Sequence, residues 1–391
     1  MGKPTIRFEG YTDDWEQRKL NEIADKVSEK NKNNEFSEPF TNSAEQGIIS
    51  QKDYFDREIV NNENLNGYYI VRNDDFIYNP RISATAPVGP INRNRLGRNG
   101  VMSPLYTVFR THDIDNLYLE FYFKTTKWHR FMKLNGDSGA RFDRFTISST
   151  QFMEMPIPYP TLEEQQKIGE YFESLDTLIT LHQRKCEETK KLKKFMLQKM
   201  FPKKGEKVPE IRFGGFTDDW EQRKLDDVVE FLDTMRKPLE GAKRISGPYP
   251  YYGASGIVDY VDGYLFDEEL ILLSEDGANI TDRNYPVCFL ASGKYWVNNH
   301  AHVLRTKQGN ENNFICNSLE RKDYTQYNTG MAMPKLNKET CKKIPILCPG
   351  FEEQKKIGDY FRSLDNLITL HQHKCEELQN IKKFMLQNMF I

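Results

Sequence analysis

The chain has 391 residues, with 55 Lys and Arg against 57 Asp and Glu, which gives a formal charge of −2. This length predicts two or three domains rather than one. The 25 Phe, 20 Tyr and 4 Trp supply enough aromatic side chains for sizeable cores, which excludes a chain that is disordered throughout. The near-neutral charge excludes binding to a polyanion through bulk charge alone, but it does not exclude a polarised binding face.

Neither a membrane protein nor a secreted protein is indicated. No apolar run approaches the roughly 18–20 residues that span a bilayer, and the opening MGKPTIRFEG is too polar for a signal peptide. The six cysteines form no C-x-x-C pair and no dense framework. We therefore expect reduced thiols in a cytoplasmic protein.

The strongest feature of the sequence is an internal repeat. Residues 4–20 recur at 209–225 with 14 of 17 positions identical, and residues 161–201 recur at 350–390 with 29 of 41 identical. We call these four segments the frame. The segments between them, 21–160 (the first insert) and 226–349 (the second insert), share almost no sequence. A period near 200 residues with two copies predicts a pseudo-dimer within one chain, with two-fold symmetry.

The frame segments 161–201 and 350–390 are predicted to form two long helices, because apolar residues recur at steps of three and four and Pro is absent. About 39 helical residues give a rod of roughly 55–60 Å, too long to be buried in a domain of about 130 residues. We expect the two helices to pack on each other. The predicted contact seam comprises Ile168, Phe172, Leu175, Ile179, His182 and Cys186 in the first helix, and Ile357, Phe361, Leu364, Ile368, His371 and Cys375 in the second.

Histidine and cysteine also lie on this seam. For His182 and His371, a role in fixing the register of the helices is far more common than metal ligation. Cys186 and Cys375 are read as small seam residues rather than redox centres. The expected organisation is a first domain at 1–160, a helix at 161–201, a linker at 202–208, a second domain at 209–349 and a final helix at 350–391.

The inserts mix short β-rich runs with Gly- and Asn-rich turns, which predicts α+β domains with mixed, curved sheets. A search for catalytic patterns finds no phosphate-binding loop, no G-x-S-x-G elbow and no metal-ligand spacing. We therefore expect no catalytic residue and no metal site in this chain.

Charge is distributed unevenly within the first insert. Residues 21–78 hold 6 basic and 12 acidic side chains, whereas residues 79–144 hold 11 basic and 5 acidic ones. The basic part interleaves Asn and Arg, the side chains that read adenine and guanine edges, and two further arginines follow a Gly-rich turn. The candidate DNA contacts are Asn92, Arg93, Asn94, Arg95, Arg98, Arg141 and Arg144.

Taken together, these segments resemble the specificity subunit of type I restriction-modification systems over essentially the whole chain. The resemblance rests on the W-x-x-x-x-L starts (Trp15–Leu20 and Trp220–Leu225) and on PYPYYGASGIVDY at 248–260. It rests also on the junctions MPIPYPTLEEQQKI and IPILCPGFEEQKKI and on the duplicated helix.

The resemblance implies that each insert is a target-recognition domain reading one half of an asymmetric, bipartite DNA sequence. The long helices would pack antiparallel and set the spacer between the half-sites. Two modification (methyltransferase) subunits would dock on the frame, and two restriction (translocase and nuclease) subunits would join them. S-adenosylmethionine, ATP and Mg²⁺ would belong to those partners. In the second insert the candidate DNA contacts are Lys243, Arg244, Lys294, Asn298, Asn299 and His300.

Two other functions compete with this one. The chain could be a self-sufficient nuclease or methyltransferase, although the missing motifs argue against that. It could also be a coiled-coil scaffold that organises other proteins without binding DNA.

Overall fold

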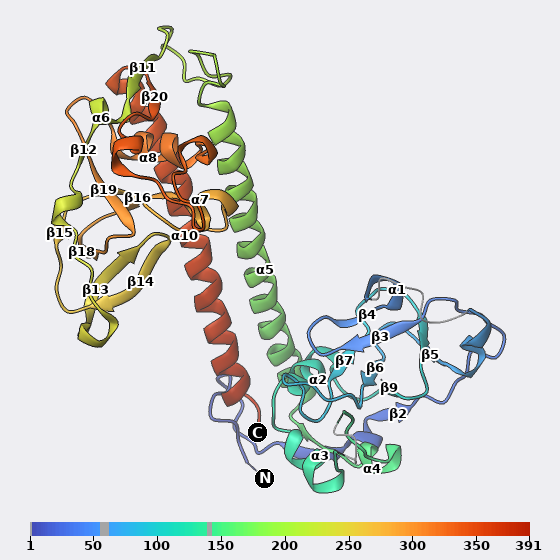
Figure 1. Cartoon of the computed structure of the whole chain (residues 1–391). Helices are drawn as coiled ribbons and strands as arrows, with labels where there is room; N and C mark the ends of the chain where they lie inside the picture. Colours follow the sequence, from blue (N-terminus) through green and yellow to red (C-terminus); the bar gives the residue numbers. More distant parts are fainter. Residues whose placement is uncertain (1, 55–61, 139–142) are drawn as a thin grey trace. The chain divides into compact units, whose positions relative to one another are not determined.

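The computed structural model describes residues 2–54, 62–138 and 143–391, and it divides into two compact units (Figure 1). Unit 1 comprises Met1–Leu181 and Lys374–Ile391, and unit 2 comprises His182–His373. Each unit contains one insert together with part of each long helix. The finer boundaries expected from the sequence, which place each long helix in a segment of its own, remain a prediction.

The two long helices are α5 (Leu162–Lys199) and α10 (Phe351–Asn388), each of 38 residues. Both begin with a pair of glutamates in the first turn, where negative charge stabilises a helix. In unit 1 the two halves run antiparallel, because Asp176 pairs with Lys382 while the Cys375 thiol lies 3.7 Å from the carbonyl of Ile179.

In unit 2 the helix halves are also antiparallel. Lys193 Nζ lies 2.6 Å from Asp365, and the Cys186 thiol lies 4.0 Å from the carbonyl of Ile368. Of the predicted seam residues, the apolar ones and the two cysteines are buried, except Ile368, which is half-buried.

His182 and His371 are both half-buried and face each other, with 2.9 Å between their Nδ1 atoms. Two imidazoles that share one hydrogen bond need one ring to accept, so at least one of the pair is neutral. No group of three or more metal-ligating side chains is found in the part of the chain that the structure describes. That this histidine pair sets the helix register remains a prediction.

The first insert contains a four-stranded antiparallel sheet of order β2-β9-β6-β7, with the pairs β3-β4 and β5-β8 beside it and β1-β10 where the insert joins α5. The strands are β1 (Glu16–Lys19), β2 (Ala24–Lys26), β3 (Phe40–Ser43), β4 (Gly47–Ser50), β5 (Tyr69–Val71), β6 (Phe76–Tyr78), β7 (Ile91–Arg93), β8 (Gly100–Met102), β9 (Thr107–Thr111) and β10 (Pro156–Tyr159). The helices are α1 (Gln51–Tyr54), α2 (Asn116–Phe123), α3 (His129–Asn135) and α4 (Ser149–Met153), with 3₁₀ turns at Leu20–Glu22 and Asn62–Gly67.

The second insert contains a four-stranded antiparallel sheet of order β12-β19-β16-β17 and a mixed sheet of order β14-β13-β18-β15, with β11-β20 at its junction with α10. The strands are β11 (Glu221–Lys224), β12 (Val229–Phe231), β13 (Ser246–Gly253), β14 (Gly256–Val261), β15 (Phe266–Asp267), β16 (Leu270–Ser274), β17 (Cys288–Ala291), β18 (Lys294–Val297), β19 (Ala301–Thr306) and β20 (Pro345–Cys348). The helices are α6 (Leu225–Val228), α7 (Asn279–Asp282), α8 (Asn312–Glu320) and α9 (Lys338–Cys341), with 3₁₀ turns at Asp233–Met235, Gly241–Lys243 and Thr325–Tyr327.

The two antiparallel sheets share one topology despite their unlike sequences. In chain order both read first, last, second and third strand, and in both the last strand leads into a helix, α2 or α8. The inserts differ in what is added to this sheet: two-stranded ribbons in the first and a second four-stranded sheet in the second. The predicted α+β class with an internal repeat is therefore confirmed, and the inserts are more alike in fold than their sequences indicate.

The frame attaches both inserts to the helices through the same contacts. The Arg7 Nε lies 2.6 Å from Glu164, and the Arg212 Nε lies 2.6 Å from Glu353. Both carboxylates are buried at the start of a long helix. The glutamine that follows each glutamate donates a hydrogen bond of 2.9 Å to the carbonyl of the proline before the helix. These contacts explain why both repeated junctions carry the letters EQ at these positions.

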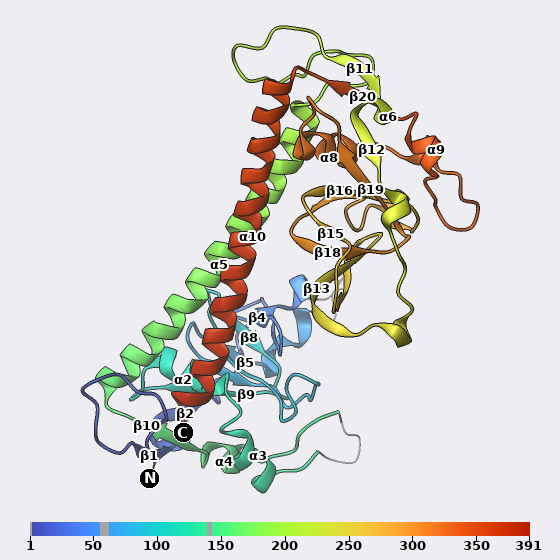
Figure 2. The same cartoon turned by 90° about the vertical axis from the view of Figure 1, so that its left-hand side faces the viewer.

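The end of one long helix is buried against each insert. In unit 1, Phe390 packs beside Tyr118 of α2 and stacks on Phe172 of α5, with ring centroids 5.5 Å and 5.8 Å away; Figure 2 shows this end of α10 beside α2. In unit 2, Phe201 stacks on Phe314 of α8 at 5.3 Å. Each insert is thereby held by both long helices.

The buried ion pairs give a stability prediction. Glu353→Gln leaves the Arg212 guanidinium without its counter-charge in a site where its side chain is 12% exposed. We expect it to destabilise the protein by about 3–5 kcal/mol, as measured by thermal or denaturant unfolding. The control Glu221→Gln removes the partner of Arg223 at an exposed site and should cost less than about 1 kcal/mol. Equal losses in the two variants would contradict this account.

Candidate nucleic-acid interface

The predicted contact run of the first insert starts on β7 and continues into the turn after it. Its two asparagines bond to the protein itself. The Asn92 amide donates to Asn42 Oδ1 at 2.7 Å. Asn94 is fully buried and donates to the carbonyls of Arg72 and Arg98 at 2.9 Å and 3.0 Å. These two amides hold the turn in shape, so they do not present free base-reading groups in this conformation.

The three arginines of the same run face carboxylates. Arg93 and Arg95 both lie 2.8 Å from Glu120 on α2. Arg98 lies 2.8 Å from Glu38, and its hydrogen bond lowers the pKa of that carboxyl. For these arginines to contact DNA, each would have to exchange a carboxylate for a phosphate or a base. Their role as DNA contacts remains a prediction.

The uneven charge of the first insert is partly neutralised by folding. Arg98 pairs with Glu38, and Arg110 pairs with Asp75 at 2.7 Å, so basic side chains from the second part of the insert meet acidic ones from the first. Charge along the sequence therefore overstates the positive field of this insert. Cations without a carboxylate partner are the better candidates for binding phosphate.

Two such cations lie opposite each other. Arg81 and Arg144 form a backbone bridge, supported by a 2.7 Å hydrogen bond from the Phe145 amide to the Pro80 carbonyl. Both side chains are exposed, and neither has a carboxylate within 4 Å among the described residues. Like charges directly across a bridge repel each other, so this pair is suited to share an anion. Arg144 was a sequence candidate, whereas Arg81 was missed because its pairing is not visible in the sequence.

The other candidates of the two inserts differ in their surroundings. Arg141 lies outside the described residues, as does the side chain of Lys243. The Arg244 guanidinium is 3.2 Å from Asp259 and stacks over a tyrosine ring. Lys294 is exposed, 4.8 Å from the centre of the Tyr264 ring, and this neighbour raises its pKa.

Asn298, Asn299 and His300 form the turn after β18. Asn298 is 7% exposed, and its Oδ1 accepts a 2.8 Å hydrogen bond from the backbone amide of His300, so its side chain stabilises the turn. The His300 ring is half-exposed, and its Nδ1 lies 2.8 Å from Asp276. The backbone carbonyl of Asn299 accepts a hydrogen bond from Arg236.

The sequence analysis missed the hairpin of β13 and β14 as a contact surface. Ile257, Val258 and Tyr260 on β14 are about half-exposed. Apolar side chains of a strand are more often buried on one face of the sheet. Tyr249 of β13 packs on Tyr264 at 5.2 Å, which links the hairpin to Lys294. Exposed aromatic and aliphatic side chains beside a cation suit stacking on bases and contact with thymine methyl groups. In the sequence this segment served only for the family resemblance, and nothing in it showed that these side chains are exposed.

No helix in the described part of the chain is long and apolar enough to cross a membrane.

Known proteins resemble this chain in sequence and in fold. A model of the type I restriction modification DNA specificity domain matches residues 12–191 and 217–380. A Haemophilus influenzae protein named as a type I restriction enzyme specificity subunit is 37% identical over 150 residues, 38% of either chain. The MjaVIII specificity subunit of Methanocaldococcus jannaschii is 25% identical over 330 residues, covering 74% of this chain and 73% of that one. The crystal structure of the S subunit from M. genitalium superposes with a TM-score of 0.65 at 13% identity, covering 100% and 99% of the two chains.

The arginine pair gives a binding prediction. We expect Arg81→Gln with Arg144→Gln to weaken binding of the full chain to duplex DNA. The slope of log affinity against log salt should fall by about 0.9 for each lost phosphate contact. The control is Arg72→Gln, which removes an exposed cation of the same insert that is paired with Glu29 at 3.2 Å and is not a candidate contact; it should change the slope less. Fluorescence anisotropy over a salt series measures both, and an unchanged slope in the double variant would refute the assignment.

Proposed function

Because the chain belongs to the type I restriction-modification DNA specificity family and is a specificity subunit, we propose that each insert reads one half of an asymmetric, two-part DNA sequence. One observation carries the proposal: the same frame contacts hold two inserts that share a core sheet and differ in the strands attached to it. Two DNA-binding domains that are attached to the helices in the same way but present different surfaces suit a target with two unlike halves.

The long helices are proposed to set the spacer between the half-sites. At about 1.5 Å per residue, 38 residues give a rod of roughly 57 Å. This length is sufficient for two readers in major grooves one helical turn of DNA apart, about 34–36 Å.

The helices also carry a surface suited to partner docking. Four large apolar side chains in each unit, two from each helix, are exposed by 36–61%. They occupy positions related by the 189-residue repeat: Leu178, Leu181, Ile381 and Phe384 in unit 1, and Leu367, Leu370, Leu192 and Phe195 in unit 2. We call this set the apolar stripe. Apolar groups gathered on a surface mark protein interfaces, and their recurrence supports one copy of the same partner on each unit.

We place two modification subunits on this stripe, with two restriction subunits joining the complex. S-adenosylmethionine, ATP and Mg²⁺ would be bound by those subunits. The specificity family is non-catalytic, so this chain would locate the site at which its partners act.

The assembled complex provides the test of function. We expect the chain with its modification subunit and S-adenosylmethionine to methylate one asymmetric two-part sequence, and the chain alone to methylate nothing. Sequencing of methylated DNA from a host with and without this gene identifies that sequence. Methylation or cleavage by the pure chain would show that it is itself an enzyme. An assembled complex that retains DNA without sequence preference would favour a scaffold.

The spacer proposal has a test of its own. Insertion of four residues, about one helical turn, in the middle of both α5 and α10 should lengthen the spacer or abolish methylation, with both half-sites unchanged. The insertion of four residues in the exposed linker at 203–207 is the matched control and should leave the spacer as it was. Changed half-sites with an unchanged spacer would contradict the assignment of reading to the inserts and spacing to the helices.

A further inference from the structure

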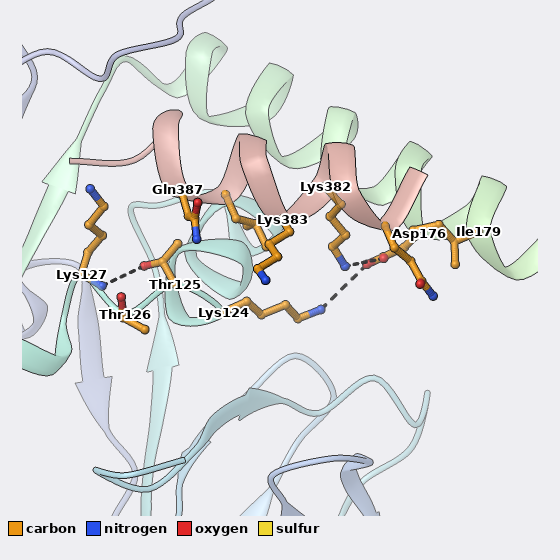
Figure 3. A pocket seen from close by; sticks show the side chains of 11 residues that line it. Lys124, Thr125, Thr126, Lys127, Asp176, Ile179, Lys382, Lys383 and Gln387 are labelled. Atoms are coloured by element: carbon orange, nitrogen blue, oxygen red, sulfur yellow. Dashed lines mark hydrogen bonds and ion pairs between the residues drawn. The ribbon is translucent and has the colours of Figure 1, made fainter. Parts of the chain in front are cut away.

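Each unit has a groove where the end of the insert helix meets the two long helices. The unit 1 groove, of about 640 Å³, lies between the end of α2 and the paired halves of α5 and α10 (Figure 3). The unit 2 groove, of about 870 Å³, lies at the end of α8 in the corresponding setting. Neither groove was anticipated from the sequence.

The two grooves are lined by the same positions of the repeat. Every long-helix residue lining the unit 1 groove has its counterpart, 189 positions away, lining the unit 2 groove. Six of these seven pairs are the same amino acid, among them Lys382 with Lys193 and Lys383 with Lys194. The insert adds a cation at the same place, since Lys124 and Arg321 are the residues that cap the ends of α2 and α8. The groove is thus a feature of the frame.

Both grooves are strongly basic, although the whole chain has a charge of −2. Four lysines and one carboxylate line the unit 1 groove, and six Lys or Arg and two carboxylates line the unit 2 groove. In unit 1 the carboxylate is Asp176, toward which Lys382 and Lys124 point in Figure 3. Lys383 is exposed without a carboxylate within 4 Å among the described residues, and its repeat partner Lys194 is the same. Such a local excess of positive charge is suited to a polyanion.

The grooves and the apolar stripe lie on different faces of the helix pair. Leu178 and Leu367 each precede a seam position by one residue, whereas Asp176 and Asp365, which line the grooves, each follow one. At about 100° per residue, these positions point to opposite sides of the seam. In two antiparallel helices, equivalent positions face the same side. A partner protein on the stripe therefore leaves the grooves free.

We propose that these two grooves bind phosphates of the DNA backbone, independently of sequence. The inference rests on the proposed function, in which duplex DNA reaches both inserts. The matching long-helix residues of the two grooves fit a ligand with the same chemistry in both units. The phosphodiester backbone is the same at both half-sites, whereas the bases differ. Besides the lysines, Gln387 and Gln198 supply amide donors of the kind that contact phosphate.

The test uses the assembled complex carrying Lys194→Gln and Lys383→Gln. Fluorescence anisotropy measures its affinity for a duplex with the sequence that it methylates and for an unrelated duplex, over 50–300 mM KCl. We expect the affinities for both duplexes to fall by the same factor, so that their ratio is unchanged. The slope of log affinity against log salt should fall by about 0.9 for each lost contact, about 1.8 in total. The charge-conserving variant with Arg at both positions should restore the slope.

The matched control is Lys204→Gln with Lys207→Gln, two exposed linker lysines, which should leave the slope unchanged. An unaltered slope in the groove variant would overturn the inference. The inference would also be overturned if the groove variant lost its modification subunits in sedimentation while the remaining complexes bound DNA as tightly as the wild type. That result would assign the grooves to an acidic segment of a partner protein. If the wild-type complex prefers no sequence, the proposed function fails, whereas failure of the groove alone leaves that preference in place.

Discussion

The architecture depends on the burial of one aromatic helix end against each insert. Phe390 in unit 1 and Phe201 in unit 2 are almost completely buried, each between an insert helix and the start of the other long helix. Burial of a phenylalanine contributes roughly 2–3 kcal/mol. The larger consequence is geometric, because an insert held by both long helices has a defined orientation on them. The buried Arg7–Glu164 and Arg212–Glu353 pairs fix the same junction from the other side.

In the proposed function, this attachment separates the frame, which positions each insert, from the insert, which reads the DNA sequence. The frame repeats its buried contacts in both units, so changes in an insert's added strands need not disturb the junction. The shared sheet order of the two inserts fits this division, since it is the sheet that leads into α2 or α8 and thereby into the contacts with Phe390 or Phe201. In the account proposed here, sequence specificity resides in the attached ribbons and hairpins, and sequence-independent affinity resides in the frame.

Much of the frame was predictable because its signals are local. Apolar residues at steps of three and four located α5 and α10 to within a few residues, and near-identical segments revealed the repeat. The inserts were less predictable, since strands of two to eight residues carry little periodicity and their common topology depends on long-range pairing. The same limit applies to charge. Arg98 and Arg110 look free in the sequence, and only the fold brings Glu38 and Asp75 to them. The grooves require the antiparallel register that sets Asp176 beside Lys382, which periodicity alone does not give.

The central claim is that the frame is indifferent to which insert it carries and that each insert brings its own half-site. An exchange tests it most directly: residues 21–160 are replaced by residues 226–349, so that both frames carry the second insert, and the DNA methylated in a host with the modification subunits is sequenced. The account predicts an inverted repeat of a single half-site in place of the asymmetric sequence. Methylation that retains the original asymmetric sequence would contradict it.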